Sequence, residues 1–302
     1  MNQLHAMYSL IRRELWEHKS LWIAPAVTAA LFLVASVWGF ISLVSNPTAV
    51  EQFNQHVLPQ MTGDRAFDVA HGMTRASAFT IYAVMVVVLF FYALDCLYSE
   101  RRDRSILFWR SLPVSDTLTV LSKLLVVLLV APVIVLLVGL ALEVLGLLLA
   151  PILVMGTDMS FGDYLQPLAA LSALFGMLGD MWLLGLWFLP YFGWLFLVSA
   201  WARKAAFLWA VLPPLGVALV EWVALSSREF LKMIGHHISL PFQNAQQQDF
   251  GFRTGDLNVE ASAAEITGLA GFAEPAFWIG LAVGVAFIAA AVAIRRYRGE
   301  TA

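Results

Sequence analysis

The chain has 302 residues, of which 60% are hydrophobic and 13% are charged, and its formal net charge is −3. A soluble globular domain has about 25% charged residues, so this composition excludes an ordinary soluble protein. The single cysteine, Cys96, excludes an intrachain disulfide and a cysteine-based metal site.

Six apolar runs are long enough to form membrane-spanning helices. A helix needs about 20 apolar residues to cross the ~30 Å hydrocarbon layer of a bilayer. The chain is therefore predicted to be an all-α, polytopic membrane protein with six transmembrane helices in a single domain, residues 1–302. The expected spans are 21–44, 77–98, 118–149, 165–200, 205–225 and 275–294.

Residues 1–19 form an amphipathic segment ahead of the first span. Leu4, Met7, Leu10 and Leu15 recur at helical spacing, with charged side chains between them. This pattern predicts an interfacial helix that lies in the plane of the membrane surface. A frayed N-terminal tail is the alternative interpretation.

The apolar run 165–200 is too long for one upright helix and barely long enough for two. Basic residues concentrate on the cytoplasmic side of membrane proteins. The basic residues of this chain follow that rule only if the run 165–200 crosses the membrane once. We therefore expect one long helix, tilted or broken, with a kink at Pro190. Both termini are then cytoplasmic, together with thirteen of the eighteen basic residues. These thirteen are Arg12, Arg13, Lys19, Arg101, Arg102, Arg104, Arg110, Lys123, Arg203, Lys204, Arg295, Arg296 and Arg298.

Two long segments are expected on the outer side. Residues 46–74 are polar and predict a loop. Residues 226–274 form a large outer loop, in which 228–236 and 261–269 have the pattern of short amphipathic helices.

The segment 99–117, between the second and third spans, combines arginines with an apolar patch at 106–109. A simple connector does not need such a patch, so the segment is expected to dock a protein partner. The alternative is an ordinary basic loop with Trp109 in the lipid headgroups. Pro113 ends the segment, and Ser115 or Asp116 caps the next helix.

The order Glu100-Arg101, then Leu112-Pro113-Val114-Ser115, then Lys123-Leu124 resembles the signature of ABC-2-type transporter permeases. That signature reads E-R-x-x-G-T, an apolar stretch, L-P-V-S, and K-L at the start of the next span. The order of elements along the chain is similar too. Arg104 stands where that family often has glycine.

The resemblance implies that residues 99–117 form a cytoplasmic coupling helix seated on a separate ABC ATPase subunit. Two such ATPases would act on two permease subunits, as a homodimer or a pseudo-symmetric heterodimer, in an exporter of the bacterial cytoplasmic (inner) membrane. The implied docking residues are Glu100, Arg101, Arg104, Ile106, Leu107, Phe108, Trp109, Leu112 and Pro113.

The chain itself has no G-x-x-x-x-G-K-[ST] phosphate-binding loop. We therefore expect no enzymatic activity and no cofactor on this chain, and expect ATP and Mg²⁺ to bind the partner ATPase. Membrane lipid is an expected partner, and nucleic acid is not.

Acidic residues inside the apolar runs are the candidates for a translocation path, because such groups usually face a bundle interior or water. The path candidates are Asp180, Glu143 and the nearby Trp182. Two further acidic residues in these runs are Asp95 and Glu221. For Asp95, Glu143 and Glu221, pairing with neighbours near the membrane surface is the simpler interpretation. An alternative function follows from these residues: a cation-coupled secondary transporter or channel.

No catalytic motif and no metal site is predicted. The adjacent His236 and His237 lack a clear third ligand, and no Ser-His-Asp or H-E-x-x-H pattern occurs. An intramembrane enzyme is therefore the least favoured of the three functional hypotheses.

Overall fold

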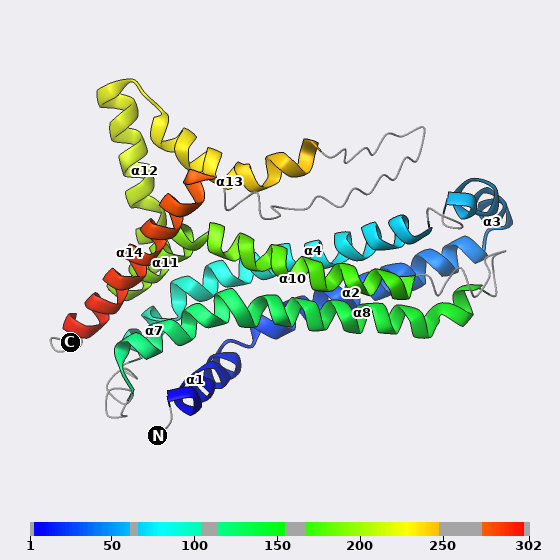
Figure 1. Cartoon of the computed structure of the whole chain (residues 1–302), viewed down its shortest axis with the longest axis horizontal. Helices are drawn as coiled ribbons and strands as arrows, with labels where there is room; N and C mark the ends of the chain where they lie inside the picture. The colour runs from blue at the N-terminus through cyan, green and yellow to red at the C-terminus, as the bar shows by residue number, and fades with distance from the viewer. Residues whose placement is uncertain (1–2, 61–65, 104–113, 155–166, 248–273, 299–302) are drawn as a thin grey trace.

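The computed structural model describes residues 3–60, 66–103, 114–154, 167–247 and 274–298, and within these ranges every regular element is helical (Figure 1). Five helical stretches in the described residues are long and apolar enough to cross a membrane, and a bent pair of helices makes a sixth when counted as one. The architecture is that of a multi-pass membrane protein. The five stretches are Ser20–Val44, Ala76–Arg102, Asp116–Leu148, Ala206–Leu225 and Pro275–Tyr297.

The N-terminal amphipathic segment forms α1 (Gln3–Glu17), which is followed after a short turn by α2 (Ser20–Val44). Ala6 and Leu10 on one face of α1 are buried, and this helix packs against α7 (Asp116–Leu125). The predicted helix is therefore present.

The prediction of a polar loop at 46–74 is wrong for the residues that the structure describes. Helix α3 (Pro47–Gln52), a π-helical turn η1 (Phe53–Val57) and a 3₁₀ turn η2 (Leu58–Gln60) follow α2, and α4 (Ala66–Asp95) begins well before the predicted span. The start of α3 has a local cause: the Asn46 side chain accepts from the backbone N–H groups of Thr48 and Ala49, and a proline occupies the first turn.

The third predicted span consists of α7, a π-helical turn η4 (Val126–Val130) and α8 (Ala131–Val154). Pro132 has no N–H group, and in a regular α-helix its ring clashes with the carbonyl four residues earlier. The wider turn η4 directly before it accommodates the proline without ending the helix. The Ser115 side chain caps α7 by accepting from the N–H of Leu118 at 3.1 Å.

The fourth run is broken, as predicted, into α10 (Pro167–Trp187) and α11 (Leu189–Trp201). The two helices are bent by 56° at Phe188, two residues before Pro190. The proline again explains the break, because it cannot donate a hydrogen bond to the preceding turn.

The last helices are α12 (Ala206–Leu225), α13 (Glu229–Gln247) and α14 (Pro275–Arg298). Helix α13 is about twice as long as the helix predicted at 228–236. Its start is capped by α12, because the Glu221 carboxylate accepts from the N–H groups of Glu229 and Phe230. The second predicted outer helix, 261–269, lies outside the described residues.

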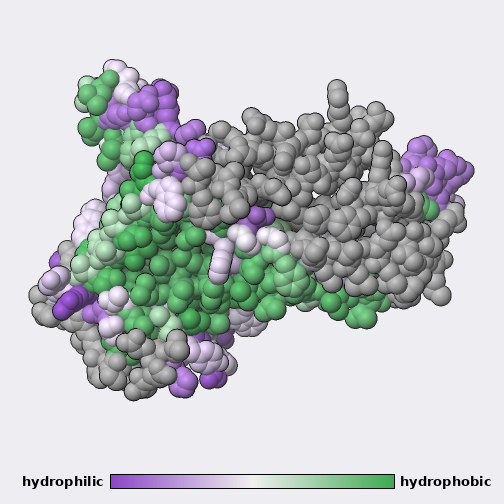
Figure 2. Space-filling view, viewed as in Figure 1, coloured by the Kyte–Doolittle hydropathy of each residue, from purple (hydrophilic) through white to green (hydrophobic). Residues whose placement is uncertain are grey.

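The long helices form two groups that meet at the α10–α11 break. Helices α2, α4, α8 and α10 run side by side, whereas α11 and α14 pack together at an angle to them (Figure 1). Hydrophobic residues cover much of the described surface on the face shown in Figure 2, as expected for helices that face lipid. Helix α1, the start of α7 and the C-terminal end of α14 all lie at the same end of the molecule.

Two glycines allow α11 and α14 to pack closely. A Cβ at Gly193 would lie 2.7 Å from the Gly284 carbonyl oxygen, and one at Gly284 would lie 2.8 Å from backbone and side-chain atoms of Leu189. Small residues commonly permit this close approach of backbones in membrane helices.

We therefore predict that Gly193→Ala separates α11 from α14 and lowers the free energy of unfolding by about 1–3 kcal/mol, the usual cost of overpacking. Denaturant unfolding of the purified full chain in detergent measures this. Gly39→Ala is the matched control, since a Cβ there meets nothing within 4 Å. Equal stability of the two variants would contradict the predicted close packing.

Candidate functional site

Lys123, on α7, lies completely buried between two carboxylates. Its Nζ atom is 2.6 Å from Glu14 Oε1 and 3.1 Å from Glu100 Oε1. Lys123 is 0% exposed, Glu14 1% and Glu100 4%. A buried charge is tolerated only when an opposite charge and hydrogen bonds compensate for the lost hydration. The lysine therefore requires both glutamates to remain in place.

Glu100 belongs to α5 (Tyr98–Arg102), at the start of the predicted coupling segment. Besides Lys123 it binds two arginines. Arg13 Nη2, on α1, donates to Glu100 Oε1 at 2.6 Å, and Arg295 Nη1, on α14, donates to Glu100 Oε2 at 2.5 Å. One carboxylate thus connects the start of this segment to α1, α7 and α14.

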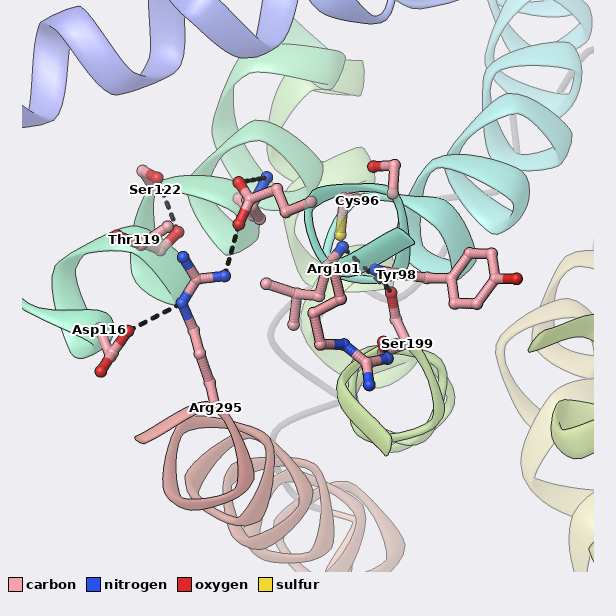
Figure 3. Close-up of polar contacts among 12 residues, drawn as sticks. Cys96, Tyr98, Arg101, Asp116, Thr119, Ser122, Ser199 and Arg295 are labelled. Atoms are coloured by element: carbon pink, nitrogen blue, oxygen red, sulfur yellow. Dashed lines mark hydrogen bonds and ion pairs between the residues drawn. The ribbon is translucent and has the colours of Figure 1, made fainter. Parts of the chain in front are cut away.

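Asp116 completes the group, because Arg295 Nε donates to Asp116 Oδ1 at 2.9 Å (Figure 3). We refer to Arg13, Glu14, Glu100, Asp116, Lys123 and Arg295 as the Glu100 cluster. Its three carboxylates balance its three cations. The hydroxyl of Tyr92, on α4, also donates to Glu14 Oε2 at 3.0 Å. The cluster therefore joins four helices, α1, α5, α7 and α14, and Tyr92 adds a hydrogen bond from α4.

The pKa directions of Arg13 and His18 agree with the three positive charges counted in the cluster. Burial lowers the pKa of Arg13, but the carboxylates of Glu14 and Glu100 outweigh it, so the pKa lies above its ordinary value. His18 lies 3.9 Å from Glu14, and its ring meets Tyr92 edge-on. Burial lowers the pKa of His18, and Glu14 only partly offsets this effect. The imidazole is thus neutral near pH 7 and adds no fourth cation.

A second set of contacts joins α5 to the C-terminal end of α11, which is expected to lie on the cytoplasmic side. The buried hydroxyl of Ser199 accepts from the backbone N–H groups of Leu97 and Tyr98 at 3.1 and 3.0 Å. In return, Arg101 Nη2 donates to the carbonyls of Ser199 and Ala202 at 2.6 and 2.8 Å (Figure 3). Each helix end thus supplies partners for the unpaired backbone groups of the other.

The sequence interpretation assigned Glu100 and Arg101 to the docking of a partner protein, and this assignment stays a prediction. In the structure, both residues bind side chains or carbonyls of this chain. Arg102 is exposed, and its Nε atom donates to Asp103 at 3.0 Å. The other predicted docking residues lie outside the described residues: Arg104, Ile106, Leu107, Phe108, Trp109, Leu112 and Pro113.

The sequence reasoning did not find the partners that hold Glu100 and Arg101. One signal was present, because Glu14 continues the buried stripe of Ala6 and Leu10 on α1, where an apolar residue is expected. No comparable local pattern marks Arg295 or Ser199, which reach the site only through tertiary packing.

The predicted path residues are distributed over two helices. Asp180 and Glu143 are half-buried on α10 and α8, and the Glu143 carboxylate is hydrogen-bonded to Thr74. Trp182 is 49% exposed on the surface of the chain. Glu221 serves as the cap of α13, and Asp95 accepts through its backbone carbonyl from Ser99.

His237 packs on the break between α10 and α11. Its ring stacks on Trp187 with the centroids 5.0 Å apart, and Trp187 Nε1 donates to the His237 carbonyl at 2.8 Å. His237 Nε2 lies 3.1 Å from the Trp187 carbonyl, so the tautomer with a proton on Nε2 donates to it. In that tautomer, His237 of α13 supplies a donor for a backbone carbonyl at the end of α10. In the described residues no group of three His, Cys, Asp or Glu side chains is arranged to hold a metal ion.

Comparison of the chain with known protein families, with curated proteins and with solved structures finds no match.

Removing the central cation tests the Glu100 cluster. Lys123→Met leaves Glu14 and Glu100 buried without this compensation and is expected to cost about 3–5 kcal/mol of unfolding free energy. Lys232→Met is the control, because the Lys232–Glu229 pair is exposed and such pairs contribute about 0–1 kcal/mol. Denaturant unfolding in detergent measures the stability of both variants. An equal loss of stability in the two variants would show that Lys123 does not hold the Glu100 cluster together.

Ser199→Ala tests the contact between α5 and α11. It leaves the N–H groups of Leu97 and Tyr98 buried without an acceptor, at an expected cost of about 1–3 kcal/mol. Hydrogen exchange of these two amides should accelerate accordingly. Ser36→Ala is the control, because that hydroxyl is exposed and bonds only to its own helix. Unchanged exchange at Leu97 and Tyr98 would refute the contact.

Proposed function

We propose that this chain is the transmembrane permease subunit of an ATP-driven ABC-2-type exporter. In this proposal the chain crosses the membrane six times, with both termini in the cytoplasm of a bacterium. The bent pair α10–α11 counts as one span. Two separate ABC ATPase subunits bind ATP and Mg²⁺, and a second copy of the permease completes the transporter.

One observation carries the proposal: the segment expected to dock the ATPase begins at a residue bound to three other helices. Glu100 contacts Lys123, Arg13 and Arg295, and each comes from a different helix. A displacement of this segment would therefore move α1, α7 and α14 together. A connector that served only as a loop would not require this buried, multi-helix attachment.

The contacts of Arg101 and Ser199 extend the same argument to α11. That helix carries the movement from α5 to the break at Phe188, where α13 packs through His237 and Trp187. In the proposed transporter this route would connect the ATP-dependent movement of the coupling segment to the opposite end of the bundle.

The complex can be tested by affinity purification of the tagged full chain from its native membranes, followed by identification of co-purifying ATP-binding subunits and measurement of ATP hydrolysis. We predict a stoichiometric ABC ATPase. Trp109→Ala and Phe108→Ala should each weaken its association about 30-fold, the effect typical of an aromatic residue central to an interface. Trp22→Ala, at an exposed tryptophan on α2, should leave the association unchanged.

A complex without an ATPase, combined with transport that persists after ATP depletion, would overturn the proposal and favour the cation-coupled alternative. In that case Asp180→Asn should abolish gradient-driven transport. Unchanged association in both Trp109→Ala and Phe108→Ala would instead show that 99–117 is an ordinary basic loop.

A further inference from the structure

The outward face of α1 carries two aromatic side chains and one basic side chain, and a second basic side chain lies in the turn that follows the helix. Tyr8, Arg12 and Trp16 follow one another at four-residue spacing, and Lys19 comes three residues later. Tyr8 is 69% exposed and Trp16 67%, and both basic residues are exposed as well. We call these four residues the α1 outer face. A helix face in contact with water alone does not favour two such large aromatic side chains.

Charge is sorted between the two faces of α1. Glu14 points inward, into the Glu100 cluster, and Glu17 accepts from Arg13 Nε at 2.9 Å. Arg12 and Lys19, by contrast, have no carboxylate partner among the residues that the structure describes. The outer face therefore presents positive charge next to aromatic rings.

The position of this face determines what can bind there. Helix α2, the first long apolar helix, begins at Ser20, directly after Lys19. The α1 outer face thus lies where the apolar part of the molecule begins, which is the level of the lipid headgroups. Tryptophan and tyrosine concentrate at that level. Arginine and lysine bind phosphate there, and an anionic membrane surface strengthens the attraction.

We propose that the α1 outer face is a binding site for the phosphate headgroups of anionic phospholipids. Arg12 and Lys19 hold the phosphate, and the rings of Tyr8 and Trp16 lie among the glycerol and upper acyl groups. This is more than adsorption of an amphipathic helix, because specific side chains select for negative charge.

The lipid site has a consequence inside the protein. The opposite face of the same helix supplies Arg13 and Glu14, which bind Glu100 and Lys123. A lipid that fixes α1 therefore also steadies the start of the 99–117 segment. An effect of the lipid on coupling rests on the proposed function, whereas lipid binding itself does not.

Trp16 provides a local probe of binding. The purified full chain in neutral detergent is titrated with brominated phosphatidylglycerol or brominated phosphatidylcholine, and tryptophan fluorescence is recorded. Subtracting the quenching of Trp16→Phe isolates the contribution of Trp16. We expect half-maximal quenching of Trp16 at a concentration roughly 10- to 30-fold lower for the anionic lipid, from the combined attraction of two basic residues.

The preference should disappear in the double variant Arg12→Gln, Lys19→Gln. The matched control is Arg203→Gln, Lys204→Gln, which removes two exposed basic residues between α11 and α12 and should keep the preference. In the unaltered protein, raising the salt concentration should weaken the anionic preference, because exposed charges are screened. The salt titration uses only the unaltered protein, so it does not depend on whether a variant folds.

Equal quenching by the two lipids would overturn the proposal. An equal loss of preference in the control variant Arg203→Gln, Lys204→Gln would also overturn it, because the preference would then come from the overall surface charge. An absence of Trp16 quenching by either lipid would also overturn it and indicate a protein occupant. Because the assay contains no ATPase and no nucleotide, its result is independent of the proposed transport function.

Discussion

A single buried carboxylate, that of Glu100, connects the segment between the second and third apolar helices to the rest of the molecule. It binds cations from α1, α7 and α14, and Lys123 shares its charge with Glu14. Buried ion pairs contribute little net stability compared with apolar packing, but breaking one is costly. The arrangement therefore acts mainly as a geometric constraint: α5 cannot shift alone without leaving several charges buried and uncompensated.

The same segment is tied to α11 by contacts of a different kind. Ser199 and Arg101 satisfy backbone groups at the ends of the two helices, and the crossing of Gly193 and Gly284 joins α11 closely to α14. The α11–α14 pair is thus held at one end by α5 and ends at the other at the 56° bend, where His237 of α13 packs against Trp187. In the proposed exporter, these contacts give a mechanical route between the two ends of the bundle.

Hydropathy and charge predicted the all-helical class, the approximate positions of the long apolar helices, and a break near Pro190, but they missed the early start of α4 at Ala66. These properties depend on local composition and on the chemistry of proline. The loop predicted at 46–74 was wrong because the Asn46 cap and Pro47 start a helix where polarity alone indicates a turn. The Glu100 cluster was not predicted, since Glu100 and Arg295 are 195 positions apart and meet only after the helices pack.

The Glu100 cluster is expected to hold α5 and α14 at a fixed separation. Spin labels at Arg102→Cys and Tyr297→Cys, both exposed positions, measure that separation in the full chain with Cys96→Ala. We expect a narrow distance distribution that broadens markedly when Lys123→Met is added and stays narrow with the surface control Lys232→Met. A distribution that is broad at the outset, or that Lys123→Met leaves unchanged, would show that the cluster does not fix this separation.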